Sequence, residues 1–233
     1  MKLKLILVLL LCLVATALSA APRLIIEESS FDFGYVPQKA RISHVFWLKS
    51  AGDDSLKILK VTPGCGCTKA PLENSEIAVG DSTRLEIIFS TKTYKNKISK
   101  SPRIQTNEGP PEKRVTFQTF VVADTMTTYP LVLKPFKIDF TSQTGKPTEL
   151  QFNITNLSDK DLNLKLVDYP VRFLSIDLPD KIHKNSSSSG TVKLVNNDLS
   201  DKFFKSFTIE VDDEENSRFT IPVSKSTKAM TNK

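Results

Sequence analysis

Two cysteines separated by a single residue are the side chains of this sequence best suited to chemistry. Cys65 and Cys67 lie in the segment Gly64-Cys65-Gly66-Cys67-Thr68. Residues two apart on an extended strand are about 6.6 Å apart, whereas the Cβ atoms of a disulfide lie about 3.8 Å apart. A bond between the two sulfurs therefore requires a turn. Gly64 and Gly66 permit backbone conformations closed to other residues, so with Thr68 they are the expected loop-shaping residues.

Several kinds of chemistry are open to this pair. The sulfurs could form a local disulfide, pack as two thiols, bind a soft metal such as Cu(I), or exchange with an intermolecular disulfide. A bond that closes so short a loop adds only about 1.6 kcal/mol in the chain-entropy relation. Stability is thus a weaker reason for the bond than local shape or redox exchange.

A metal site at the cysteines would be short of ligands. Zinc takes three or four protein ligands, and the chain has only two histidines, His44 and His183. His44 is expected on a strand of the same domain as Cys65 and Cys67, and is the candidate third ligand. Histidines in such places are more often simply half-exposed, so no cofactor is expected apart from the possible Cu(I).

Enzymatic motifs are missing from the sequence. It contains no Gly-x-Ser-x-Gly elbow, no phosphate-binding glycine loop and no His-Glu-x-x-His element. Two histidines expected in separate domains leave few ways to build a Ser–His or Cys–His nucleophilic pair. We therefore expect a non-enzymatic protein without catalytic residues, with thiol–disulfide exchange at the cysteines as the enzymatic alternative.

The first 20 residues have the pattern of an export signal. Lys2 and Lys4 form its basic start, residues 5–14 its apolar core and residues 15–20 its small-residue end. The apolar run is shorter than the ~20 residues of a membrane-spanning helix. Cleavage after Ala20 would remove Cys12 and leave no stable membrane anchor. The expected location is the periplasm or the extracellular space, where cysteines can pair.

Charge argues against nucleic acid as a partner. Removal of Lys2 and Lys4 lowers the 32 basic residues to 30 against 26 acidic ones, a net charge of +4. These charges are scattered and form no dense basic run that could follow a phosphate backbone. The remaining length suits two domains of about 100 residues each.

Short alternating segments predict an all-β protein. Residues 31–34 alternate apolar and polar side chains before an expected turn, and residues 44–48, 56–61, 85–89 and 115–122 are further candidate strands. No long stretch of the mature chain has helical periodicity. Strands at this spacing are typical of an antiparallel β-sandwich.

An internal repeat divides the chain into two copies. Phe46, Leu48, Leu56 and Ile58 recur at a constant offset as Phe152, Ile154, Leu162 and Leu164. Ser50 corresponds to Asn156, and Leu85 and Ile87 correspond to Val192 and Leu194 with an offset one residue larger. The repeated apolar positions are expected to be buried, with Trp47 and Asn153 on the opposite face.

The repeat predicts two tandem sandwich domains. The first covers residues 24–124 and the second, without cysteines, residues 127–225, followed by a disordered basic tail over 226–233. The polar linker near residues 123–130 predicts modest contact between domains that fold separately, unless a large apolar interface forms between them. In the second copy, residues 168–173 replace the cysteine segment, so the cysteines are not needed simply to make this fold.

The first domain resembles an exported bacterial family, Domain of Unknown Function 1573. The resemblance is carried in order by Phe31, Phe33 and Gly34, by Phe46 and Leu48, by Cys65-Gly66-Cys67-Thr68, by Val79-Gly80-Asp81-Ser82 and by Thr106-Asn107. That family is similar to Hydin-type (ASH) domains and, more distantly, to sperm-protein and pilus-chaperone domains. The resemblance implies an immunoglobulin-like sandwich and export, and it implies no activity. Lys49-Ser50 departs from the family, which usually has asparagine at the second position.

The resulting hypothesis is an exported, non-enzymatic immunoglobulin-like protein of the bacterial cell envelope that binds another protein or an envelope component. Its alternative is a thiol-redox or copper-handling protein that acts through Cys65 and Cys67. Phe203 and Phe204 are adjacent, and strand alternation buries only one of such a pair. One of them is therefore a candidate for an exposed interaction patch, unless a bulge buries both.

Overall fold

The protein is all-β in the residues that the computed structural model describes, which are 20–123, 128–141, 147–195 and 202–225. The strands are β1 (Leu24–Ile26), β2 (Ser30–Pro37), β3 (Arg41–Ser50), β4 (Leu56–Thr62), β5 (Thr68–Lys69), β6 (Glu76–Ile77), β7 (Ser82–Ser90), β8 (Asn96–Lys100), β9 (Arg103–Thr106), β10 (Lys113–Arg114), β11 (Thr116–Val122), β12 (Leu131–Lys134), β13 (Ile138–Asp139), β14 (Glu149–Asn156), β15 (Leu162–Asp168), β16 (Leu174–Asp177), β17 (Lys181–Ile182), β18 (Ser187–Leu194), β19 (Phe203–Val211) and β20 (Arg218–Lys225). The described part has no helix long and apolar enough to cross a membrane. The predicted signal core and basic tail lie outside the described residues.

The first immunoglobulin-like sandwich packs its sheets around one core. One sheet has the order β1-β3-β7-β5 and another the order β10-β9-β4-β6, while β2, β11 and β8 belong to a longer sheet. Phe46, Leu48 and Leu85 are buried in this core, and Trp47 points outward. The register predicted from alternation is therefore confirmed for β3.

The second sandwich has its own core. The sheet β12-β14-β18-β16 packs with β17, β15, β19 and β20, and Phe152, Ile154 and Val192 are among the buried side chains. Leu164, which the repeat predicts to be buried, is only half-buried against this core. Most strand pairs are antiparallel, and β2–β11, β2–β20 and β13–β20 are parallel.

Strand pairing supports the repeat but changes its alignment. Phe46 pairs with Leu85, whereas its counterpart Phe152 pairs with Gly190 rather than Val192. Leu85 therefore corresponds to Gly190, two residues before the predicted Val192. The segment between the two paired strands is one residue shorter in the second copy, whereas the prediction made it one residue longer. A slip of two residues keeps the same face, so the predicted burial still held.

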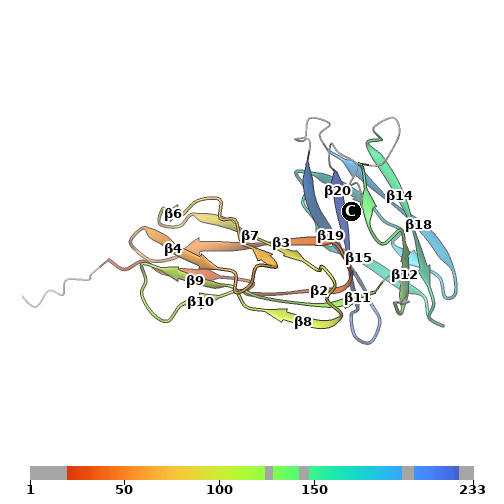
Figure 1. Ribbon diagram of the computed structural model, residues 1–233, viewed down its shortest axis with the longest axis horizontal. Coiled ribbons are helices and arrows are strands. Elements are labelled where there is room, and N and C mark those ends of the chain that lie inside the picture. The colour runs from red at the N-terminus through yellow and green to blue at the C-terminus, as the bar shows by residue number, and fades with distance from the viewer. Residues whose placement is uncertain (1–19, 124–127, 142–146, 196–201, 226–233) are drawn as a thin grey trace, which may run out of the picture.

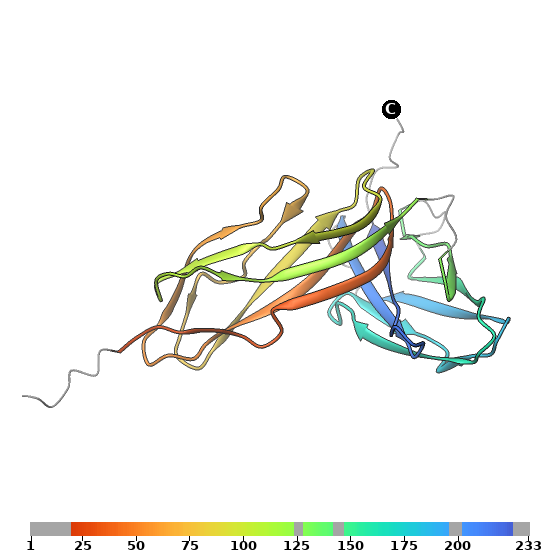
Figure 2. The same cartoon turned by 90° about the horizontal axis from the view of Figure 1, so that it is seen from below.

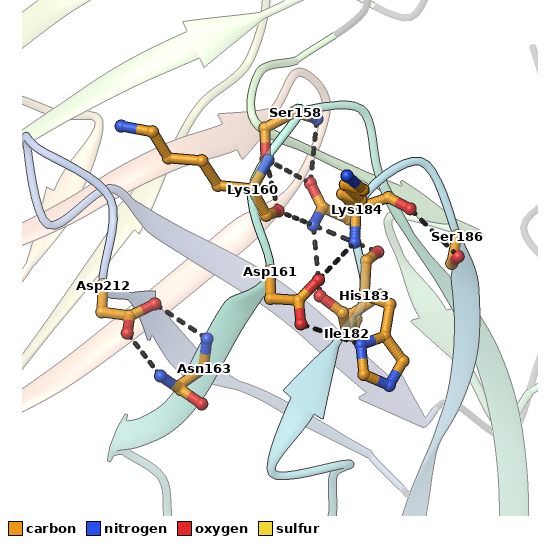
Figure 3. A network of polar contacts seen from close by, with 10 residues as sticks. Ser158, Lys160, Asp161, Asn163, Ile182, His183, Lys184, Ser186 and Asp212 are labelled. Carbon is orange, nitrogen blue, oxygen red and sulfur yellow. Dashed lines mark hydrogen bonds and ion pairs between the residues drawn. The ribbon is translucent and has the colours of Figure 1, made fainter.

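The turn after the first repeated strand differs between the copies. Asn156 is buried, and its side-chain nitrogen donates to the carbonyls of Lys160, Ile182 and His183 at 2.8, 3.2 and 3.3 Å. Around it, the carboxylate of Asp161 accepts hydrogen bonds from the amide of Lys184 and the ring of His183, which lie in the turn after β17, as Figure 3 shows. In the first copy, Ser50 is equally buried, but its hydroxyl has no partner among the described residues.

One sheet continues from the second domain into the first. Its strand order is β17-β15-β19-β20-β2-β11-β8, so β20 of the second domain borders β2 of the first. Figure 1 shows the strands of the second sandwich running across those of the first at this junction. In Figure 2, β2 (orange-red) and its partner β11 (green) run side by side toward the second domain.

Gly34 lies within β2, at this junction, and the strand continues to Pro37 instead of turning directly after residue 34. Its φ is +60°, and a Cβ at this position would overlap the backbone carbonyl of Arg218 on β20. The ladder with β11 shifts register opposite Gly34, which marks a bulge. Glycine is required here because two backbones from different domains approach closely.

Contact between the domains is more extensive than the polar linker predicts. Tyr35 pairs with Phe219 and their rings stack with centroids 5.2 Å apart. The Thr220 hydroxyl donates to the Phe33 carbonyl at 2.6 Å. The linker alone does not indicate this contact, because the strands of the two domains meet edge to edge away from it.

Neither of the two adjacent phenylalanines of β19 is fully exposed. Phe203 is buried, and Phe204 is half-buried beneath the guanidinium of Arg41, which lies 4.1 Å from the ring centre. The exposed phenylalanine patch is thus not present, and Phe204 belongs to the domain junction.

Candidate functional site

The cysteine segment forms a turn between β4 and β5 at the edge of the first sandwich. A disulfide joins Cys65 to Cys67, and their Cα atoms are 5.3 Å apart, closer than in an extended strand. The amide of Thr68 donates to the carbonyl of Cys65 at 3.3 Å, and the amide of Ser90 on β7 donates to the carbonyl of Cys67 at 2.8 Å. These bonds hold the turn against β7.

The two glycines of the segment have different roles. Gly64 has a φ of +86°, in the left-handed region that favours glycine. Gly66 has an ordinary φ, and a Cβ built on it would meet no atom within 4 Å. The backbone therefore requires glycine at 64, and neither backbone nor packing requires it at 66.

The two sulfurs have different surroundings. Cys67 is buried in the core of the first sandwich, and Cys65 is only partly buried against it. The buried hydroxyl of Thr68 lies 3.3 Å from Sγ of Cys65 and 3.9 Å from Sγ of Cys67. If the bond opened, this hydroxyl could donate a hydrogen bond to a thiolate.

The structure does not bring His44 to the cysteines. Its ring stacks on Phe31 with centroids 3.7 Å apart, and its Nδ1 lies 2.9 Å from Oδ2 of Asp168 in the second domain. Among the described residues, no group of three or more His, Cys, Asp or Glu side chains could hold a metal ion. The geometry places His44 in the domain junction and gives no support to a copper site that includes it.

Two further polar contacts secure this junction. The amide of Ser43 on β3 donates to the hydroxyl of Ser206 on β19 at 2.9 Å, and that hydroxyl donates to the carbonyl of Ser43 at 3.0 Å. Beside them, Nζ of Lys205 lies 2.7 Å from Oε1 of Glu86. Sequence reasoning missed these residues, because nothing in their types or spacing separates them from ordinary outward-facing strand positions.

The segment that replaces the cysteine turn in the second copy lies at the same junction. It begins with Asp168, the partner of His44, and continues through Pro170, whose carbonyl accepts the amide of Phe173 at 2.8 Å. The Phe173 ring lies 4.7 Å from Nζ of Lys205. The two equivalent segments have therefore diverged, one into a disulfide turn and the other into a domain contact.

This second segment forms one wall of a cleft between the domains, which we call the elbow cleft. The cleft has a volume of 380 Å³, and the outer faces of β3 and β7 form its floor. Three large apolar or aromatic side chains line it while exposed: Trp47 at 56%, Tyr169 at 39% and Val171 at 61%. The prediction that Trp47 lies on the outer face of its strand is confirmed. The cleft around it was not predicted, because strand alternation does not indicate where the second domain lies relative to the first.

The elbow cleft carries unneutralised positive charge. Glu86 and Asp168 line it, but each is paired with a basic side chain of the other domain. Arg84 and Arg172 also line it, and neither has an ion-pair partner among the described residues. Arg84 lies 5.8 Å above the Trp47 ring, so cation and aromatic surface are presented together.

Comparison with known proteins gives a family match over the first domain. Residues 24–121 match the family described as "Protein of unknown function (DUF1573)". A search of curated proteins finds no match. Among solved structures, the chain is similar to a protein of unknown function from Porphyromonas gingivalis W83, with 12% identity and a TM-score of 0.35 over 86% of this chain and 98% of that one.

Two further solved structures are similar to this chain. The ASH/PapD-like domain 7 of human CEP192 has 8% identity and a TM-score of 0.36, over 47% of this chain and 92% of that one. The YadV chaperone has 13% identity and a TM-score of 0.32, over 86% of this chain and 98% of that one.

Proposed function

We propose that this chain, whose residues 24–121 match the family of unknown function DUF1573, is an exported, non-enzymatic binding protein of the bacterial cell envelope. It holds a segment of another protein in the elbow cleft. The signal-like pattern of residues 1–20 supports export, and the immunoglobulin-like fold is suited to a binding or structural role.

The observation that carries this proposal is the exposure of Trp47 in the elbow cleft. Tryptophan, tyrosine and arginine are the residues that most often contribute large shares of binding energy at protein interfaces. Here Trp47, Tyr169, Arg84 and Arg172 line one cleft, although they come from two domains. Contacts between the domains hold the two walls together before a partner arrives, which lowers the entropic cost of binding.

The charge of the cleft indicates the chemistry of the partner. Its unpaired charges are positive, and its exposed apolar surface is largely aromatic. A complementary segment presents aromatic or aliphatic side chains next to aspartate or glutamate. Arginine recognises carboxylates with paired hydrogen bonds, so the acidic residues would lie beside Arg84 and Arg172.

Trp47 is the only tryptophan of the chain, so its fluorescence reports directly on the cleft. The protein without residues 1–20 is titrated with the synthetic peptide Ser-Phe-Asp-Phe-Glu-Ser and with its lysine counterpart Ser-Phe-Lys-Phe-Lys-Ser. We expect a saturable blue shift with the acidic peptide and binding weaker by about tenfold or more with the basic one. The double substitution Arg84→Gln and Arg172→Gln should abolish this preference.

The matched control replaces two arginines on the opposite sheet of the same domain, Arg103→Gln and Arg114→Gln, and should keep the preference. Unchanged Trp47 emission with both peptides would remove the cleft as the binding site. Equal binding of both peptides would refute the charge argument.

A second function, thiol–disulfide exchange, is favoured by the Thr68 hydroxyl beside both sulfurs. An incoming thiolate would attack the partly exposed Sγ of Cys65, form a mixed disulfide there and release Cys67 as a thiolate. In oxidised glutathione, the variant Cys67→Ser should then form a mixed disulfide at Cys65. The control Cys65→Ser should react much more slowly because Cys67 is buried, and equal rates would exclude this direction of attack.

A further inference from the structure

A second pocket at the domain junction is lined by cations. It has a volume of 340 Å³ and lies between the turn before β3, the turn after β7, and strands β19 and β20. Lys39, Arg41 and Lys92 line it together with the hydroxyl-bearing residues Ser90 and Thr93. We call it the basic pocket.

The cations of the basic pocket are not neutralised. Its lining contains no aspartate or glutamate. Within the described ranges, Lys39, Arg41 and Lys92 have no carboxylate at ion-pair distance. Lys137 also lines the pocket but interacts with another group. Like charges that line one pocket repel one another, and an anion bound among them relieves this repulsion.

Two of these cations are held by unusual backbone. Lys39 and Lys92 have φ values of +53° and +41°, a left-handed conformation that costs energy for residues other than glycine. The amide of Lys39 donates to the carbonyl of Lys92 at 2.7 Å, which joins the two turns directly. Backbone strain of this kind is concentrated at functional sites, where the surrounding structure maintains it.

Buried polar side chains maintain this strain. The Thr91 hydroxyl is buried, accepts the amide of Ala40 at 2.9 Å and donates to the carbonyl of Pro37 at 2.9 Å. The side-chain nitrogen of Gln38 donates to the carbonyls of Thr93 and Tyr94 at 3.2 and 2.7 Å. The two lysine-bearing turns are thus fixed to each other before any ligand binds.

The third cation extends the pocket to the second domain. The guanidinium of Arg41 lies 4.1 Å from the ring centre of Phe204, and Nζ of Lys202 lies 5.6 Å from the same ring. Stacking on the ring orients the guanidinium while leaving its donors available. An anion bound by Arg41 and the two lysines would therefore contact both sides of the junction.

We propose that the basic pocket binds a multivalent oxyanion, a phosphate or pyrophosphate group. Three cations and two neighbouring hydroxyls supply donors from several directions, which suits a tetrahedral group with several charged oxygens. The group could come from a free phosphorylated molecule or from a phospholipid head group. This inference is independent of the elbow cleft, whose lining residues are different.

Calorimetric titration of the protein without residues 1–20 tests the proposal, with pyrophosphate as the probe. The triple substitution Lys39→Asn, Arg41→Gln and Lys92→Asn removes the charges, and asparagine tolerates the left-handed backbone of both turns. We expect saturable, salt-sensitive binding that weakens by about tenfold or more in this variant. The control Lys95→Gln, Lys97→Gln and Lys100→Gln removes three cations near and on β8 and should bind as the wild type does.

Sedimentation with phosphatidylglycerol vesicles, compared with phosphatidylcholine vesicles, identifies the source of the phosphate. Binding of pyrophosphate alone supports a free ligand. Binding to the anionic vesicles that is lost in the pocket variant but kept in the control supports a head group. The proposal is overturned if neither probe binds, or if the two triple variants lose binding equally, since general charge would then explain the result.

Discussion

Ser50 and Asn156 occupy equivalent positions in the two domains, but their side chains form different numbers of hydrogen bonds. The buried Asn156 amide serves three carbonyls and accepts from Ser158, whereas the Ser50 hydroxyl is buried without a partner among the described residues. A buried polar group without a partner costs about 1–3 kcal/mol. The turn of the domain that carries the cysteines thus lacks the side-chain contacts that Asn156 makes in the other domain.

The substitution Ser50→Asn should stabilise the protein by about 1 kcal/mol, because asparagine can reach turn carbonyls as Asn156 does. The reciprocal substitution Asn156→Ser should destabilise it by about 1–3 kcal/mol. Urea unfolding of both variants measures the two effects. A loss of stability in Ser50→Asn would show that the first-domain turn has no room for the larger side chain.

Acid sensitivity should arise from two aspartates of the second domain. The amide of Lys184 and the ring of His183 lower the pKa of Asp161, and the side chain and amide of Asn163 lower the pKa of Asp212. A folded-state pKa below the unfolded value gives stability that is complete above the unfolded pKa and is lost as the pH falls through the folded one.

The free energy of unfolding should therefore decline as the pH falls below about 4, the ordinary aspartate pKa. Asp161→Asn and Asp212→Asn should each make this decline shallower in urea unfolding between pH 3 and about 6. Asp177→Asn, at an exposed position of β16, is the control and should leave the decline unchanged. An undiminished decline in both variants would contradict the assignment.

At the scale of elements, the strands pair in the same way with or without the disulfide turn. The second copy builds the same pairing without it, so Cys65→Ser with Cys67→Ser should leave the first domain folded at a cost of about 1–2 kcal/mol. Circular dichroism and thermal unfolding of the double variant check this. An unfolded first domain, or a melting temperature many degrees lower, would make the disulfide structural and remove the basis for thiol chemistry.

The elements themselves were largely predictable, because alternation within one strand is a local signal. The faces of Phe46, Trp47 and Phe152 followed from it directly. What failed was long-range: the alignment of Gly190, the bulge at Gly34 and the position of His44 depend on which strands meet. The elbow cleft was unpredictable for the same reason, since the first-domain and second-domain residues that line it are at least 82 residues apart along the chain (Glu86 to Asp168).

At the scale of the whole molecule, the junction makes two sandwiches into one scaffold. Gly34 tests this directly, because a Cβ there would overlap the Arg218 backbone of the other domain. Gly34→Ala should destabilise the protein by about 2 kcal/mol and loosen the domains in small-angle scattering. Gly66→Ala, in open space, should change stability by less than about 0.5 kcal/mol. An equal loss of stability in the two variants would mean that the close approach of β2 to β20 at Gly34 does not hold the domains together.

Site-specific photo-crosslinking in living cells tests the central claim, that the elbow cleft holds a protein partner in the cell envelope. A photoreactive phenylalanine replaces Trp47 in one strain and Leu59 in another. These side chains are 56% and 58% exposed, on the two different sheets of the first sandwich. We predict a discrete crosslinked adduct in the periplasmic fraction from position 47, weakened by Arg84→Gln and Arg172→Gln and absent from position 59. No adduct at position 47, or equal adducts at both positions, would contradict the account.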